Sequence, residues 1–159
     1  MVWLEASIQW LHILFAIFWF GSTLFTDFVL MPAVMEMSPA GQRELGQRVG
    51  PITARLEPRA AVATIVLGAL RGTVFGPVQS LSALVGTAYG LTWLVSLLLA
   101  VGLFAFGEWV LTPAVARIPR TATPDEQARL IGQVRRYTLI QLAAFLLILV
   151  AMVLMHYEG

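Results

Sequence analysis

Long apolar runs alternate with short arginine-rich stretches along this chain. Residues 6–26 contain no Asp, Glu or Arg, and neither do residues 89–106 or residues 137–157. A helix of about 20 such residues is long enough to cross the ~30 Å hydrocarbon core of a bilayer. Each of the three runs is therefore predicted to be a membrane-spanning helix.

A fourth and weaker span is predicted over residues 51–70. Its first half contains Arg55, Glu57 and Arg59, which makes it less apolar than the other three. Four spans joined by short connections predict an all-α fold, an integral membrane four-helix bundle that forms a single domain over residues 1–159.

Both longer connections are expected to contain helical structure. Residues 38–50 are polar and are predicted to form a short separate helix at the membrane surface. Thr123, Pro124 and the two acids after them have the sequence of a helix start, with a capping side chain and a proline at the first position. The last helix is therefore predicted to begin near Pro124 in water and to continue into the membrane.

Two octapeptides in the chain resemble each other. Residues 27–34 read Asp-Phe-Val-Leu-Met-Pro-Ala-Val, residues 108–115 read Glu-Trp-Val-Leu-Thr-Pro-Ala-Val, and five of the eight positions are identical at an offset of 81. This similarity predicts a tandem repeat of a two-helix hairpin, with parallel halves of about 1–80 and 81–159. A weaker similarity joins residues 45–48 to residues 131–135. The alternative is chance together with the common use of proline where a helix leaves the membrane.

The arginines are distributed unequally between the connections. Nine of the ten lie in or beside the first and third connections: Arg43, Arg48, Arg55, Arg59, Arg117, Arg120, Arg129, Arg135 and Arg136. Only Arg71 lies on the other side. Because arginine-rich connections stay in the cytoplasm, both chain ends are predicted to lie outside, in a multi-pass protein of a bacterial inner (cytoplasmic) membrane.

The composition limits the chemistry that the chain can perform. The chain is 58% hydrophobic and 12% charged, with a mean hydropathy of +0.81, which argues against a soluble enzyme. The formal net charge of +1 does not indicate a nucleic-acid partner. There is no cysteine and no lysine, so disulfides, thiolate metal sites and Schiff bases are excluded within these 159 residues.

His12 is the clearest candidate for a functional residue. It lies about two turns into the first predicted span and shares a helix face with Trp19, Thr23 and Asp27. This polar stripe is predicted to face the bundle interior, because polar groups directed at lipid are costly. Asp27 is expected to meet an arginine of the second or fourth helix. The alternative role for His12 is an interhelical hydrogen bond.

His156, near the end of the last span, is predicted to lie at the same side of the membrane as His12. Two neutral imidazoles across a helical bundle form a common axial pair for a b-type haem. The same histidines together with Met152 or Met155 would suit copper. His12 and His156 are therefore candidate cofactor and metal ligands, although His156 alone is also a common interfacial residue.

Arg71 is the second candidate for the haem site. It follows Arg59 by twelve residues, about 18 Å along a helix, so both cannot reach the two headgroup layers without cost. A haem propionate could pair with Arg71, and Glu5 or Glu158 are the alternative partners. At the cytoplasmic side a belt of ion pairs is expected among Arg55, Arg59, Asp27, Glu57 and Glu108.

Residues 11–21, Leu-His-Ile-Leu-Phe-Ala-Ile-Phe-Trp-Phe-Gly, resemble the first-helix signature of two groups of small membrane proteins. One is the copper resistance D (CopD-like) family, and the other is the J-type membrane protoporphyrinogen oxidase, a four-helix haem-b protein. Residues 89–94 are similar to a Tyr-Gly helix of the copper group, whose following lysine stands as Ser96 here. The resemblance implies haem binding at His12, with Trp19 at the family-like spacing.

Three kinds of function are compatible with these features. The first is an integral membrane b-type haem-binding protein of CopD-like type that transfers electrons. The alternatives are a copper-handling membrane protein and a cofactor-free accessory subunit. The expected partners are the lipid bilayer and a second copy or a larger membrane complex, with no nucleic acid. No Ser-His-Asp or HExxH constellation indicates a hydrolase, and catalytic turnover is left open.

Overall fold

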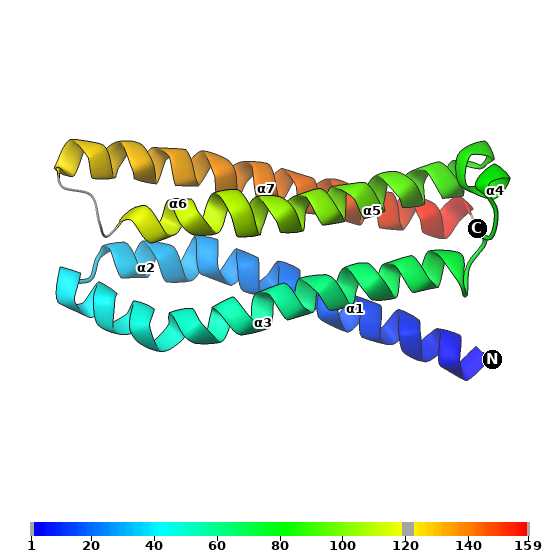
Figure 1. Ribbon diagram of the computed structural model, residues 1–159, viewed down its shortest axis with the longest axis horizontal. Coiled ribbons are helices and arrows are strands. Elements are labelled where there is room, and N and C mark those ends of the chain that lie inside the picture. The colour runs from blue at the N-terminus through cyan, green and yellow to red at the C-terminus, as the bar shows by residue number, and fades with distance from the viewer. Residues whose placement is uncertain (1, 119–122, 159) are drawn as a thin grey trace.

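The computed structural model describes residues 2–118 and 123–158, and this part of the chain is helical with no strand (Figure 1). The elements in chain order are α1 (Val2–Phe25), η1 (Thr26–Leu30), α2 (Met31–Met35), α3 (Pro39–Thr73), α4 (Leu81–Gly86), α5 (Ala88–Phe106), η2 (Gly107–Leu111), α6 (Thr112–Arg117) and α7 (Pro124–Glu158). Both chain ends and α4 lie at one end of the molecule, the terminal end, and α2, α6 and the start of α7 lie at the other, the loop end.

Three of the long helices have the length and composition of membrane spans. They cover Val2–Met35, Ala88–Arg117 and Asp125–Tyr157, which is the composition of a multi-pass membrane protein. Many of their large apolar side chains are exposed, as expected for side chains that contact lipid rather than water. The predicted fourth span lies in α3, which contains too many charged residues to qualify by composition alone.

The prediction of a separate surface helix over residues 38–50 is wrong, because α3 runs unbroken from Pro39 to Thr73. The Ser38 side chain caps the helix by accepting a hydrogen bond from the Gly41 N–H at 3.3 Å. Pro51 and Pro58 each remove one N–H donor without ending the helix. Packing of α3 along α1 outweighs this local cost. The predicted start of the last helix at Pro124 is confirmed.

Both halves contain a five-residue π-helical segment at the same place in the repeat. Thr26–Leu30 and Gly107–Leu111 are separated by the offset of 81 that relates the two octapeptides. Each segment ends with a hydrogen bond between residues five apart, from the Met31 N–H to the Thr26 carbonyl and from the Thr112 N–H to the Gly107 carbonyl. In each copy a proline is the second residue after the segment, and the wider turn keeps its ring clear of the preceding carbonyls.

The second helices of the two hairpins, α3 and α7, also correspond. Each has 35 residues and begins with proline after a capping residue, Ser38 or Thr123. Aligned on these starts, the offset is 85, and it superposes four identical inward-facing pairs: Gln42 with Gln127, Leu45 with Leu130, Val49 with Val134, and Thr53 with Thr138. The weaker similarity between residues 45–48 and residues 131–135 aligns the two helices differently, with a shift of one to two residues from this register. The two offsets differ because the stretch from the octapeptide to the first proline of the next helix is four residues longer before α7.

A small aromatic core joins the two hairpins. The Trp19 ring of α1 meets the Phe145 ring of α7 edge-on at a centroid separation of 5.0 Å, and Phe20 packs on the same ring. Trp19 and Phe145 are 7% and 5% exposed. Small residues of α3, Ala60 and Ala61, complete this core and allow the backbones to approach closely.

Candidate functional site

The His12 side chain lies half-buried between α1 and α3. Its Nδ1 is 2.9 Å from the backbone carbonyl oxygen of Thr64. The ring rests against Gly68, where a Cβ atom would lie only 2.9 Å from the His12 Cε1. The glycine therefore lets the imidazole reach the α3 backbone.

This hydrogen bond determines the tautomer of His12. A carbonyl oxygen only accepts, so Nδ1 must carry the hydrogen and donate it. Nε2 then has a free lone pair, and it makes no hydrogen bond to any residue that the structure describes. An imidazole held through Nδ1–H by a backbone carbonyl is the usual arrangement of a histidine that binds a metal through Nε2.

Trp93 corresponds to His12 at the offset of 81 that relates the two octapeptides. Its Nε1–H donates to the Gly68 carbonyl at 3.3 Å, one turn of α3 beyond the carbonyl that His12 contacts. The indole lies directly against Gly72. In each half of the repeat, a ring N–H therefore donates to a backbone carbonyl of α3, and the two carbonyls are one helical turn apart. Sequence reasoning missed Trp93, although the offset of 81 applied to His12 points to it.

The structure shows no contact between His156 and His12. His156 is exposed, and its ring packs edge-on against Tyr157 at 5.6 Å. Trp19 faces Phe145, and counting seven residues along each antiparallel helix places His12 level with Met152 rather than with His156. His156 lies four residues further, about 6 Å along the axis. Within the described ranges, no group of three or more His, Asp or Glu side chains could hold a metal ion.

The Arg71 guanidinium binds the backbone of the connection that follows α3. Its NH1 donates to the Phe75 carbonyl at 2.7 Å. No ion pair with Glu5 forms among the described residues, and the Glu158 side chain lies outside them. The guanidinium retains further donors, because one of its five N–H groups makes this bond.

Trp19, Thr23 and Asp27 follow His12 along the inner face of α1, which confirms the predicted orientation of this stripe. Trp19 is part of the aromatic core, and its carbonyl accepts the Thr23 hydroxyl at 3.0 Å. The Thr138 side chain of α7 is a hydrogen-bonding partner of the Asp27 carboxyl. The stripe therefore runs from the α1–α3 contact at His12 to the contact between η1 and α7 at Asp27.

The expected belt of arginine–carboxylate pairs at the loop end is wrong. The only ion pair in the described part of the chain joins Arg48 to Glu44 at 2.9 Å, on the exposed surface of α3. Arg55 and Arg59 are exposed, whereas Glu57 is turned inward. Residues two apart on a helix project in nearly opposite directions, so these arginines cannot accompany Glu57 to the bundle interior.

Instead, three carboxyl groups from different elements approach one another at the loop end. Asp27 of η1 and Glu108 of η2 both lie near enough to Glu57 of α3 to repel its charge. Gln141 of α7 is 6% exposed and lies close to Gly107, the residue before Glu108, with its Nε2 4.0 Å from where a Gly107 Cβ would be. The Gln141 Oε1 is buried and has no partner among the described residues. The helical period of the last span places Gln141 on the same face as Phe145 and Met152, but it does not identify what Gln141 meets there.

Comparisons with known proteins place the chain in no group. No family model matches it, and neither a curated protein nor a solved structure does.

Proposed function

We propose that the protein crosses the membrane four times and binds a b-type haem through His12 at its terminal end. The fourth crossing would be made by α3, which at 35 residues is about 52 Å long and matches α7. The arginine bias of the connections supports both chain ends outside, in a bacterial cytoplasmic membrane.

Single cysteines test the fourth crossing, since the chain has none of its own. Val2→Cys, Met37→Cys and Gln79→Cys lie at the terminal end, the loop end and the terminal end, respectively. An impermeant maleimide applied from outside should label positions 2 and 79 but not 37. Labelling of 37 and 79 from the same side would refute a crossing by α3.

The Nδ1–H bond from His12 to the Thr64 carbonyl carries the haem proposal. It leaves the Nε2 lone pair free and fixes the plane of the ring, and these are two requirements of a histidine that holds a haem iron. His12 would therefore hold the haem through Nε2. Met152, level with His12, and His156, one turn further, are the candidates for a second residue that would hold it.

The residues around His12 would hold the ring rather than react. The Thr64 carbonyl would keep the proton on Nδ1. Gly68 has no side chain, so it would allow the His12 ring to lie against α3. Arg71, with donors left after its bond to Phe75, would attract an anionic group at the terminal end. A bound b-type haem would supply one-electron transfer. A second copy of the chain or a larger membrane complex would be the electron-transfer partner.

The absorption spectrum of the purified protein, expressed with added haem, tests this proposal. We expect a Soret band and a reduced α-band in the wild type, and loss of both in His12→Ala. His156→Ala and Met152→Leu should identify the second ligand, because losing it converts the iron to high spin. A colourless wild type, or a His12→Ala variant with an unchanged low-spin spectrum, would overturn the assignment.

The equivalence of His12 and Trp93 favours a second candidate function, that of a cofactor-free accessory subunit. Tryptophan cannot ligate a metal, yet both rings bind α3 carbonyls in the same way. A colourless, metal-free wild type that is destabilised by His12→Ala would support this function. Copper found by metal analysis in that colourless protein would instead favour copper handling through His12 and the nearby methionines.

A further inference from the structure

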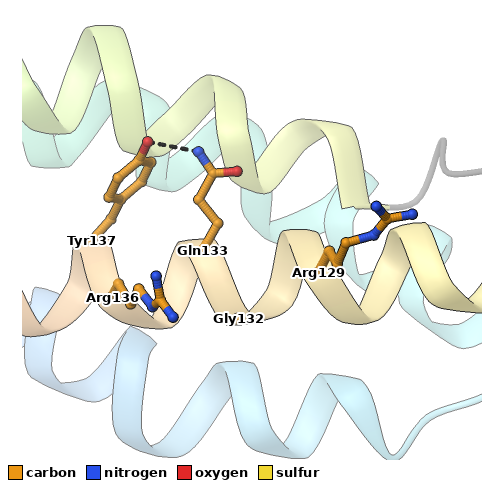
Figure 2. A pocket seen from close by; sticks show the side chains of 5 residues that line it. All are labelled: Arg129, Gly132, Gln133, Arg136 and Tyr137. Atoms are coloured by element: carbon orange, nitrogen blue, oxygen red, sulfur yellow. Dashed lines mark hydrogen bonds between the residues drawn. The ribbon is translucent and has the colours of Figure 1, made fainter.

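A shallow groove of about 620 Å³ lies on α7 at the loop end, away from His12. Figure 2 shows the five residues that line it, Arg129, Gly132, Gln133, Arg136 and Tyr137. All five belong to the stretch of α7 that precedes or begins its uncharged run of residues 137–157. The groove therefore lies where α7 enters the apolar layer, at the level of the lipid headgroups.

Two arginines provide the charge of this groove. Arg129 and Arg136 are exposed and seven residues apart, so they share a face of α7 about 10 Å from each other along the axis. Arg129 Nε donates weakly to the Asp125 carbonyl at 3.4 Å. Neither guanidinium is paired with a carboxylate of the described residues. Both are free to receive an anion.

The floor and one wall of the groove have a defined shape. Tyr137 packs edge-on against Phe106 of α5 at 5.5 Å, which fixes its ring. Its hydroxyl oxygen accepts a hydrogen bond from Gln133 Nε2 at 2.7 Å, so the phenolic hydrogen remains available as a donor (Figure 2). Nothing lies within 4 Å of the place where a Cβ of Gly132 would be, so this glycine leaves the floor open.

The repeat supplies an internal comparison. At the offset of 85, Arg129 corresponds to Glu44 and Gln133 to Arg48, and these two α3 residues neutralise each other in an ion pair of 2.9 Å. Gly132 corresponds to Gln47, whose side chain would occupy the floor. The α3 face therefore has a neutralised ion pair and a glutamine side chain, where the corresponding α7 face has a glycine and Arg129, which has no carboxylate partner among the described residues.

We propose that this groove binds the phosphate group of an anionic phospholipid. Arginine presents a fork of donors that matches phosphate oxygens, and basic pockets beside membrane helices recognise anionic headgroups. The position of the groove at the start of an apolar run favours a lipid over a soluble phosphate, because the acyl chains would follow α7 into the bilayer. This site is independent of the proposed haem site at the terminal end.

The binding of phosphatidylglycerol to the purified full-length protein tests the proposal. Native mass spectrometry in detergent should show tighter binding of phosphatidylglycerol than of phosphatidylcholine. Arg129→Gln with Arg136→Gln should weaken phosphatidylglycerol binding about thirtyfold, since each arginine near an anionic lipid contributes about 1 kcal/mol. Gly132→Leu should weaken it similarly by filling the floor, since its Cβ would meet no atom within 4 Å and the charge does not change.

The matched control removes two exposed arginines from the corresponding part of α3, Arg43→Gln with Arg48→Gln. It should leave phosphatidylglycerol binding within twofold of wild type. An equal loss in this control would show that only overall charge matters, and would overturn the site. Competition by glycerol phosphate at the same concentration as the lipid would assign the groove to a soluble phosphate instead. Retained binding in Gly132→Leu would also refute it.

Discussion

Gly72→Ala should destabilise the protein more than any other glycine-to-alanine change in α3. Gly72 is buried, and a methyl group there would overlap the Trp93 indole, coming within 2.6 Å of its Cδ1 and closer still to its nitrogen. The ring can escape only by giving up the 3.3 Å hydrogen bond from Nε1 to the Gly68 carbonyl. The substitution therefore combines overpacking with the loss of an interhelical bond.

The expected cost of Gly72→Ala follows from these two effects. Overpacking costs about 1–3 kcal/mol, and the lost hydrogen bond about 1 kcal/mol more. The better helix propensity of alanine returns up to about 1 kcal/mol. The free energy of unfolding should therefore fall by about 1–3 kcal/mol.

Titration of the detergent-solubilised protein with sodium dodecyl sulfate, followed by circular dichroism and tryptophan fluorescence, measures this change. Gly46→Ala is the matched control in the same helix, because nothing lies within 4 Å of its new methyl group. It should be neutral or slightly stabilising. If Gly72→Ala were as stable as Gly46→Ala, the close packing of Trp93 on α3 would be refuted.

Three further predictions concern the bundle interior and use the same titration. Trp19→Ala and Phe145→Ala should each cost about 3–5 kcal/mol, with a coupling energy of about 0.5–1.5 kcal/mol in the double variant, and additive losses would contradict their edge-on contact. Thr138→Val should cost about 1–3 kcal/mol by leaving Asp27 without its hydroxyl partner, and an unchanged midpoint would contradict that bond. Gln141→Leu should stabilise the protein by about 1 kcal/mol, because it removes a buried acceptor without a partner, whereas a loss of stability would show that Oε1 is bonded.

Much of the candidate site depends on approaches between helices that no local pattern contains. The periodicity of α1 predicts that His12 points inward. Its partner cannot be predicted in this way, because the Thr64 carbonyl is a backbone group and no side chain in the sequence marks it. The carboxyl at Asp27 was expected to meet an arginine, since burying a lone charge is costly. It meets Thr138 instead, because Arg55 and Arg59 of α3 are exposed and project away from the bundle.

Local patterns in the sequence are enough to predict the three uncharged spans, the helix start at Pro124 and the similarity of the two octapeptides. Uncharged runs of about 20 residues can bury their backbone groups only as helices, and the paired prolines after Asp27 and Glu108 mark the same turn twice. These are local properties, because helix hydrogen bonds and proline geometry act within five residues.

Which groups meet depends on the tertiary structure. Glycines at 68 and 72 let two rings reach the backbone of α3, and the rotation of α3 about its axis directs Glu57 inward and Arg55 and Arg59 outward. The five identities between the octapeptides do not reveal that Trp93 stands where the other half has His12. Such contacts depend on the separation and rotation of whole helices, which side-chain packing between elements determines and which the period of one helix does not contain.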